Sequence, residues 1–161
     1  MSTQFKLGNI EFIQGICNPS TLEDGRGGLF TFLPVDGDKI VEFNFVYYNA
    51  NKIRGNHYHP EFNEYILIVE GSGAILTKDS DDNTILRHIC VGDCMRIPQD
   101  TPHAIHALTD LKLVSFLTKN WDDCNHPIIH DHVVEQDDEY RKYAEKAGFT
   151  FSAEEIREKN K

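Results

Sequence analysis

Hydrophobic and polar residues alternate along much of the chain with the period of β-strands. Residues 40–48 (IVEFNFVYY) and 84–91 (TILRHICV) alternate with a period of two, as expected for strands with one buried face. Residues 65–69 (YILIV) and 111–117 (LKLVSFL) are apolar on both faces, which indicates strands covered on both sides. We therefore expect an all-β domain that spans residues 27 to about 118.

Turn-forming residues separate these segments. Glycine tolerates positive φ, proline fixes φ, and aspartate and asparagine bond to nearby backbone groups, so clusters of them mark chain reversals. The predicted turns are residues 36–38, 71–73, 79–83, 92–93 and 98–102. Many short strands joined by regular turns predict a sandwich or a small barrel.

The last quarter of the chain changes to a helical pattern. Residues 137–147 begin with acidic residues and are followed by Gly148, as in a helix with a C-terminal glycine cap. Residues 152–155 (SAEE) form a capping box, which predicts a second short helix. We therefore divide the chain into a β-barrel with an N-terminal strand segment (1–120) and a mainly helical extension (121–161), packed on the barrel or at a dimer contact.

Two imidazoles and a carboxylate are predicted to converge near the middle of the chain. His57 and His59 are two residues apart, so in a strand both side chains point to one face. Pro60 ends that strand, and Glu64 then begins the next strand beside the histidine pair. Imidazole and carboxylate groups are ligands that zinc, iron, manganese and nickel accept.

His103 is expected to supply a fourth ligand. It begins a strand after Pro98 and shares its face with Ile105 and Ala107, whereas His106 points to the opposite, outer or dimer face. The predicted ligands of one divalent transition metal are therefore His57, His59, Glu64 and His103.

The two ligand stretches resemble the two motifs of the cupin superfamily. The first reads HxH(x)4E(x)6G from His57 to Gly71, and the second reads G(x)5P(x)4H from Gly92 to His103. The second motif has Asp100 where the family usually has glycine, and it lacks the customary asparagine, but neither departure removes a ligand. The resemblance covers roughly residues 20–118 and implies a double-stranded β-helix, a jelly-roll barrel, with the metal in its mouth.

Two arginine-containing segments resemble a narrower group of cupins. Residues 24–27 (DGRG) and 54–57 (RGNH) are similar to signatures of cupins that isomerise or epimerise nucleotide-linked 4-keto sugars, and the region around residues 54–64 looks closest to the C-terminal cupin domain of bifunctional capsular-polysaccharide enzymes. The resemblance implies that Arg54 and Arg26 bind an anionic small-molecule substrate, since a guanidinium binds a pyrophosphate with paired hydrogen bonds. The alternative role of both arginines is ion pairing with surface acids.

The resemblance leaves the catalytic residue open. Proton abstraction beside a ketone needs a base, and a Lewis-acid metal can stabilise the enolate oxygen. His57 is a candidate base only in a metal-free site, because a metal-bound imidazole cannot also take the proton. With metal bound, Tyr58, Tyr47, Tyr48 or a metal-bound hydroxide would move the proton.

Three classes of function fit these residues. The leading hypothesis is a metal-binding isomerase or epimerase that acts by proton transfer on a nucleotide-linked keto sugar in polysaccharide biosynthesis. Three histidines and one glutamate also suit a non-haem iron dioxygenase or related oxidoreductase acting on a small organic molecule. The third possibility is a barrel that binds a small ligand without turning it over.

A second group of ligand-type residues follows the barrel. Its members are Cys124, His126, His130 and His132. The zinc pattern is weak because Pro127 interrupts it and no CxxC pair is present, so we expect surface or interface histidines here. Trp121 is expected to pack on the barrel rim, with a place in the substrate mouth as the alternative.

Composition restricts the partners. The 161 residues include 16 Lys and Arg against 26 Asp and Glu, which gives a net charge of −10 and predicts no nucleic-acid partner. No apolar run is long enough to span a bilayer, and no secretory signal pattern is visible, so we expect a cytoplasmic protein without a membrane partner. A Cys90–Cys94 disulfide is possible across a hairpin, but reduced thiols are favoured. Pairing through a barrel edge strand predicts a homodimer.

Overall fold

The computed structural model describes residues 3–17 and 27–135 of the chain. Both expected helices, over residues 137–147 and from residue 152, lie outside this part, and so does Arg26. Within the described residues, no helix has the length and apolar character needed to cross a membrane.

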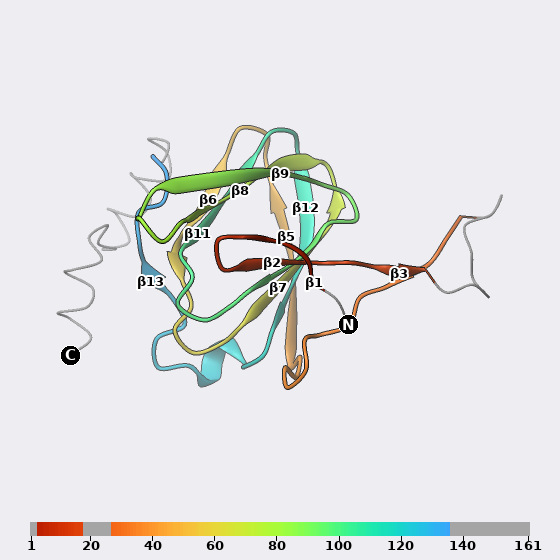
Figure 1. Ribbon diagram of the computed structural model, residues 1–161, viewed down its shortest axis with the longest axis horizontal. Helices are drawn as coiled ribbons and strands as arrows, with labels where there is room; N and C mark the ends of the chain where they lie inside the picture. Colours follow the sequence, from red (N-terminus) through yellow and green to blue (C-terminus); the bar gives the residue numbers. More distant parts are fainter. Residues whose placement is uncertain (1–2, 18–26, 136–161) are drawn as a thin grey trace.

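Two antiparallel sheets form the barrel in the described part of the chain (Figure 1). One sheet contains the strands β1 (Thr3–Leu7), β2 (Ile10–Ile13), β5 (Glu42–Tyr48), β7 (Glu64–Glu70), β10 (Cys94–Ile97) and β12 (Leu111–Leu117). The other contains β6 (Ile53–Tyr58), β8 (Ser72–Lys78), β9 (Thr84–Cys90), β11 (His103–Ala107) and β13 (Ile129–His130). Their orders are β1-β2-β10-β7-β12-β5 and β13-β6-β11-β8-β9.

Smaller elements lie outside the two large sheets. The strands β3 (Ile16–Cys17) and β4 (Phe30–Thr31) pair with each other, and a short 3₁₀ helix, η2 (Trp121–Asp123), follows β12. The described residues are therefore almost entirely β, which confirms the all-β class.

The strands predicted from periodicity are present. The segments at 40–48, 65–69 and 84–91 correspond to β5, β7 and β9, and the segment at 111–117 is β12 itself. The predicted turns lie between strands, except that the turn at 71–73 shrinks to Gly71, because β8 already begins at Ser72.

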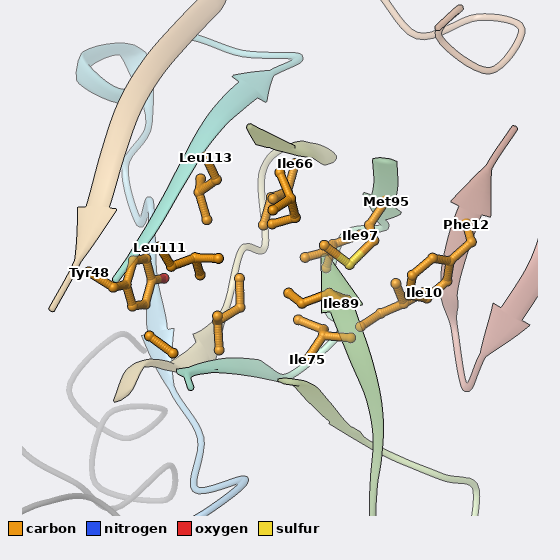
Figure 2. Close-up of a cluster of buried hydrophobic side chains, with 13 residues drawn as sticks. Ile10, Phe12, Tyr48, Ile66, Ile75, Ile89, Met95, Ile97, Leu111 and Leu113 are labelled. Atoms are coloured by element: carbon orange, nitrogen blue, oxygen red, sulfur yellow. The ribbon is translucent and has the colours of Figure 1, made fainter. Parts of the chain in front are cut away.

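The main hydrophobic core fills part of the space between the two sheets (Figure 2). Ile75 from β8, Ile89 from β9 and Leu111 from β12 are buried there, together with Met95 of β10. The outer face of β7 and β12 is covered separately, because Tyr65 packs against partly buried apolar side chains of the loop before β5. Strands β7 and β12 therefore have apolar residues on both faces, as their sequences indicate.

Part of the extension after residue 120 joins the barrel. Strand β13 pairs antiparallel with β6 and lies at the outer edge of the five-stranded sheet, as Figure 1 shows. Cys90, which is exposed, and Cys94, which is buried, are both free thiols, so no disulfide joins the cysteines of the hairpin.

Candidate metal and substrate site

A cavity of about 640 Å³ lies between the two sheets. One wall is formed by alternate residues of β5, namely Glu42, Asn44, Val46 and Tyr48. Apolar side chains of β7, β11 and β12 also line it, together with Trp121 and Asp122 of η2. The lining therefore mixes apolar side chains with polar ones, among them Glu42 and Asn44 of β5 and the predicted ligands.

The structure brings the four predicted ligands together at this cavity. Strand pairing places His57 of β6 directly opposite His103 of β11, and His59 follows immediately after β6. The nearest ring nitrogens of the three histidines lie within 4.8 Å of one another. Glu64 begins β7 in the facing sheet, as predicted, and its Oε2 lies 2.9 Å from Nε2 of His59.

A glycine allows β6 and β11 to approach at this point. Gly55 has a φ of +108°, and a Cβ there would lie 2.8 Å from the carbonyl oxygen of His103 and 2.9 Å from the Cα of Ala104. The pairing register shifts between His103 and Ala104, which indicates a bulge or a similar irregularity. The glycine of the RGNH segment thus sets the spacing of the histidine strands.

Backbone carbonyls fix the orientation of two histidine rings. Nδ1 of His59 lies 2.9 Å from the carbonyl oxygen of Pro127, and Nδ1 of His103 lies 2.9 Å from that of Thr101. Because a carbonyl oxygen only accepts hydrogen bonds, each Nδ1 carries the donated hydrogen. Both Nε2 atoms therefore face Glu64, whose Oε2 lies 3.4 Å from Nε2 of His103.

The carboxylate of Glu64 is held in its ionised form. Burial by itself raises the pKa of Glu64, but the charge of His59 and the hydrogen bonds to His103 and His59 lower it well below its usual range. Ser115 also donates a 2.7 Å hydrogen bond to Oε1. An ionised oxygen and an imidazole lone pair at 2.9 Å require a proton or a metal cation between them, so the donor set fits a divalent transition metal.

His57 differs from the other two histidines. Burial, followed by the charges of His103 and His59, lowers the pKa of His57 well below its usual range. Its imidazole is therefore neutral at physiological pH and has a lone pair available as a metal ligand or a proton acceptor.

Arg54 also lines the cavity, as expected for a substrate-binding arginine. Its guanidinium carbon lies 5.6 Å from the ring centroid of Tyr48, and the side chain is exposed. Burial raises the pKa of Tyr48, so the phenol keeps its proton. Arg54 is the one arginine or lysine among the described residues that line this cavity.

Of the three candidate tyrosines, Tyr58 and Tyr47 lie outside the cavity. Tyr58 is buried against Ile129 and does not line the cavity. Tyr47 is 66% exposed and belongs to the outer face of β5, while its neighbour Tyr48 faces the cavity. Alternation along a strand explains both placements, since residues next to a cavity-facing position point away from it.

The second histidine group is dispersed. His126 and His132 are exposed, as expected, whereas His130 is buried in β13 opposite His57. In the described part of the chain, His57, His59 and His103 are the one group that could hold a metal. His106 is only partly buried and lies on the other face of β11 from His103 and Ile105, as predicted. Trp121 lines the cavity, with its ring centroid 6.4 Å from that of His59.

Sequence reasoning missed three groups that support the ligands. These are the hydroxyl of Ser115 and the carbonyls of Thr101 and Pro127. Serine occurs in many strands, and a backbone carbonyl has no sequence signature. The alternation of β12 turns Ser115 to the same side as Leu113, toward the interior. This was the one sequence feature that could have indicated a hydroxyl in the cavity.

Comparison with known proteins identifies the family. A family model described as the polysaccharide biosynthesis C-terminal domain matches residues 22–127, which is more than half of the chain. The chain belongs to this family. No curated protein shows a significant match to it. The polysaccharide biosynthesis C-terminal domain family agrees with the resemblance to capsular-polysaccharide cupins.

Solved structures share the fold at low sequence identity. A 3,4-ketoisomerase from Helicobacter canadensis has a TM-score of 0.65 at 15% identity, over 88% of this chain and 99% of that chain. A dTDP-6-deoxy-D-glucose-3,5-epimerase from Legionella pneumophila, in complex with dTDP-4-keto-L-rhamnose, has a TM-score of 0.56 at 15% identity, over 72% and 70%. The capsular polysaccharide assembling protein CapF from Staphylococcus aureus has a TM-score of 0.53 at 22% identity, over 74% of this chain and 33% of its own. The fold is therefore cupin-like.

Proposed function

We propose that this chain is an isomerase or epimerase that moves a proton on a nucleotide-linked keto sugar, with a divalent metal at its histidine centre. The observation that carries the proposal is one cavity that combines the centre at His57, His59, His103 and Glu64 with Arg54. The enzymes of similar fold are named as a 3,4-ketoisomerase and as an epimerase of a dTDP-linked sugar. The family supports a role in polysaccharide biosynthesis.

Each side chain has a distinct role in this proposal. Arg54 binds the diphosphate of the nucleotide, because its guanidinium can donate two parallel hydrogen bonds. His57, His59, His103 and Glu64 hold the metal. When bound, the metal supplies a Lewis acid for the ketone oxygen.

Tyr48 is the tyrosine that we assign to proton transfer. It lines the cavity, and because burial raises its pKa it keeps its proton at neutral pH, so it can donate a proton to the enolate but cannot serve as the base. Tyr47 and Tyr58 lie outside the cavity and take no part in the proposal. Without metal, His57 becomes the base, since its neutral imidazole lines the same cavity.

Solvent deuterium exchange tests the reaction. The protein is incubated in D₂O with TDP-4-keto-6-deoxyglucose or dTDP-4-keto-L-rhamnose, and deuterium beside the carbonyl is followed by NMR. We expect exchange with the wild-type protein and at least a tenfold slower rate for Tyr48→Phe. A lack of exchange across a panel of such sugars contradicts the proposal. Oxygen consumption that depends on ferrous iron would support a dioxygenase in its place.

Metal binding is tested separately. Titration of the metal-free protein with Zn²⁺, Fe²⁺, Mn²⁺ or Ni²⁺ should show one equivalent bound, and elemental analysis identifies the metal in the purified protein. His57→Ala should abolish stoichiometric uptake. Absence of uptake by the wild-type protein, or unchanged uptake by His57→Ala, contradicts the metal assignment.

We also propose that the protein is a homodimer that pairs through β5. This strand is at the edge of the six-stranded sheet, and its outward residues Phe43, Phe45 and Tyr47 are 74%, 61% and 66% exposed. An edge strand with a row of exposed aromatic side chains favours pairing with another strand. A second copy presents the same edge, so one symmetric contact covers both.

A further inference from the structure

The segment after η2 is tied to the histidine strand. We call residues 127–134 the strap. Its strand β13 pairs with β6, with Ile129 opposite Tyr58 and His130 opposite His57. Lys78 of β8 forms a 2.9 Å ion pair with Asp131. The strap therefore crosses the outer side of the sheet that carries His57.

Asn56 is joined to the strap by several hydrogen bonds. Its Oδ1 accepts hydrogen bonds from the backbone N–H groups of Val133 (2.9 Å) and Val134 (3.0 Å), and its Nδ2 donates to the carbonyl of Val134 (3.0 Å). Its own carbonyl accepts a hydrogen bond from the N–H of Asp131 (2.9 Å). The amide is 2% exposed, so these bonds form away from water and fix the end of the strap.

The backbone of Asn56 is adapted to this role. Its φ is +55°, in the left-handed region that asparagine tolerates better than most residues. This conformation turns the Asn56 side chain toward the strap, while the next residue, His57, lines the cavity. Asn56 itself does not line the cavity.

The other end of the strap reaches the histidine centre. The carbonyl of Pro127 accepts the 2.9 Å hydrogen bond from Nδ1 of His59. With the hydrogen on Nδ1, the Nε2 atom of His59 faces Glu64 and the other histidines. Partners of this kind set the tautomer and the ring orientation of a ligating histidine.

We propose that Asn56 is a positioning residue for His59. It holds the strap on β6, the strap holds the Pro127 carbonyl on Nδ1, and this carbonyl presents Nε2 to the cavity. The inference deepens the proposed function and rests on it for the role of the centre. The hydrogen bond from His59 to Pro127 can be measured without metal or substrate.

The test uses Asn56→Gly in the full chain. Glycine accepts the left-handed φ, so this variant removes the amide contacts without straining the backbone. Alanine at this φ would strain the backbone. NMR of ¹⁵N-histidine-labelled protein without metal reports solvent exchange of the His59 Nδ1 proton. We expect a slowly exchanging proton in the wild type and exchange at least about tenfold faster in Asn56→Gly. The zinc dissociation constant should rise about 10- to 100-fold, as for the loss of other supporting groups around metal ligands.

Asn51→Gly is the matched control. Asn51 also has a left-handed φ, of +66°, but it is exposed, and its backbone N–H bonds to the carbonyl of Ala107 rather than to the described residues of the strap. It should behave as the wild type in both measurements. Lys78→Met provides a second variant, which loosens the strap at Asp131 and should shift both measurements in the same direction as Asn56→Gly.

Two results overturn the inference. One is a wild-type His59 that carries no proton on Nδ1, which can be seen even if Asn56→Gly fails to fold. The other is a folded Asn56→Gly or Lys78→Met variant with wild-type proton exchange and wild-type zinc affinity. If the Nδ1 proton behaves as expected but no keto sugar exchanges deuterium, the proposed function fails and the positioning role of Asn56 stands.

Discussion

The hydroxyl of Ser115 donates a 2.7 Å hydrogen bond to Oε1 of Glu64. Oε2 of the same carboxylate faces His59 and His103. Ser115 lies on β12 and Glu64 begins β7, and these strands are hydrogen-bonded neighbours. The six-stranded sheet therefore fixes one oxygen of Glu64 and directs the other toward the histidines of the facing sheet.

Ser115→Ala should weaken metal binding. Without the hydroxyl, Oε1 loses its donor and the Glu64 carboxylate is free to rotate, so zinc affinity should fall about 10- to 100-fold. Isothermal titration calorimetry measures this effect. Ser72→Ala in β8 makes the same chemical change outside the cavity and should leave the affinity unchanged. Equal affinities of Ser115→Ala and the wild type would exclude this role of Ser115.

Gly55→Ala should destabilise the fold and disturb the histidine centre. The new methyl group would lie 2.8 Å from the His103 carbonyl oxygen at a φ of +108°, so we expect a loss of at least about 2 kcal/mol in the free energy of unfolding. Gly92→Ala has a comparable φ of +91° but no atom within 4 Å of the added Cβ. Gly92→Ala should therefore lower the free energy of unfolding by less than Gly55→Ala does. Equal losses for the two variants, measured by urea unfolding, would show that the close approach to His103 is unimportant.

Arg54→Ala should weaken the binding of thymidine diphosphate. Hydrogen bonds to a charged group contribute about 1.5–3 kcal/mol, which corresponds to roughly a 10- to 150-fold change in the dissociation constant. Zinc affinity should not change, since Arg54 is not a ligand. Lys112→Ala removes the same charge outside the cavity and serves as the control. Unchanged diphosphate affinity in Arg54→Ala would contradict its role in substrate binding.

Asp38 should make stability sensitive to acid. Burial raises its pKa, but hydrogen bonds from Arg96, Tyr65 and Asn63 and the charge of Arg96 lower it below the unperturbed 3.8. A lowered folded-state pKa gives stability that is present above pH 3.8 and is lost as the pH falls through the folded-state pKa. Asp38→Asn should be less stable than the wild type at pH 7 by about 3 kcal/mol. Its free energy of unfolding in urea should also depend less on pH below about 4, whereas parallel curves would contradict the expectation.

Phe45→Glu should convert the proposed dimer into a monomer. The substitution places a charge in the exposed aromatic row of β5, where two copies would meet. Light scattering should give the mass of two chains for the wild type and of one chain for Phe45→Glu. Leu86→Glu changes a similarly exposed residue, 55% against 61%, on the other sheet and should remain dimeric. A wild-type mass of one chain would rule out the homodimer.

Local pattern was sufficient for four of the strands and for grouping the candidate ligands. The period of two predicted β5 and β9, because burial on one face repeats at every second residue, and β7 and β12 were predicted from apolar residues on both faces. The same alternation placed His57 and His59 on one side and put His103 with Ile105 on the cavity face. Tyr58 is a candidate for proton transfer from its place in the sequence, but the structure places it, next to His57, outside the cavity. Alternation could not choose between Tyr47 and Tyr48, because periodicity does not say which face of β5 points inward.

The sequence by itself therefore determined which residues could form the centre and which strands carry them. The tertiary structure decided what holds the centre in place. Ser115 lies 51 positions from Glu64, Pro127 lies 68 positions from His59, and Val133 lies 77 positions from Asn56. Hydrogen bonds over such separations depend on sheet register and on the path of the strap. These are set by the packing of the whole barrel, because a local pattern fixes only the face of a strand and not its partner.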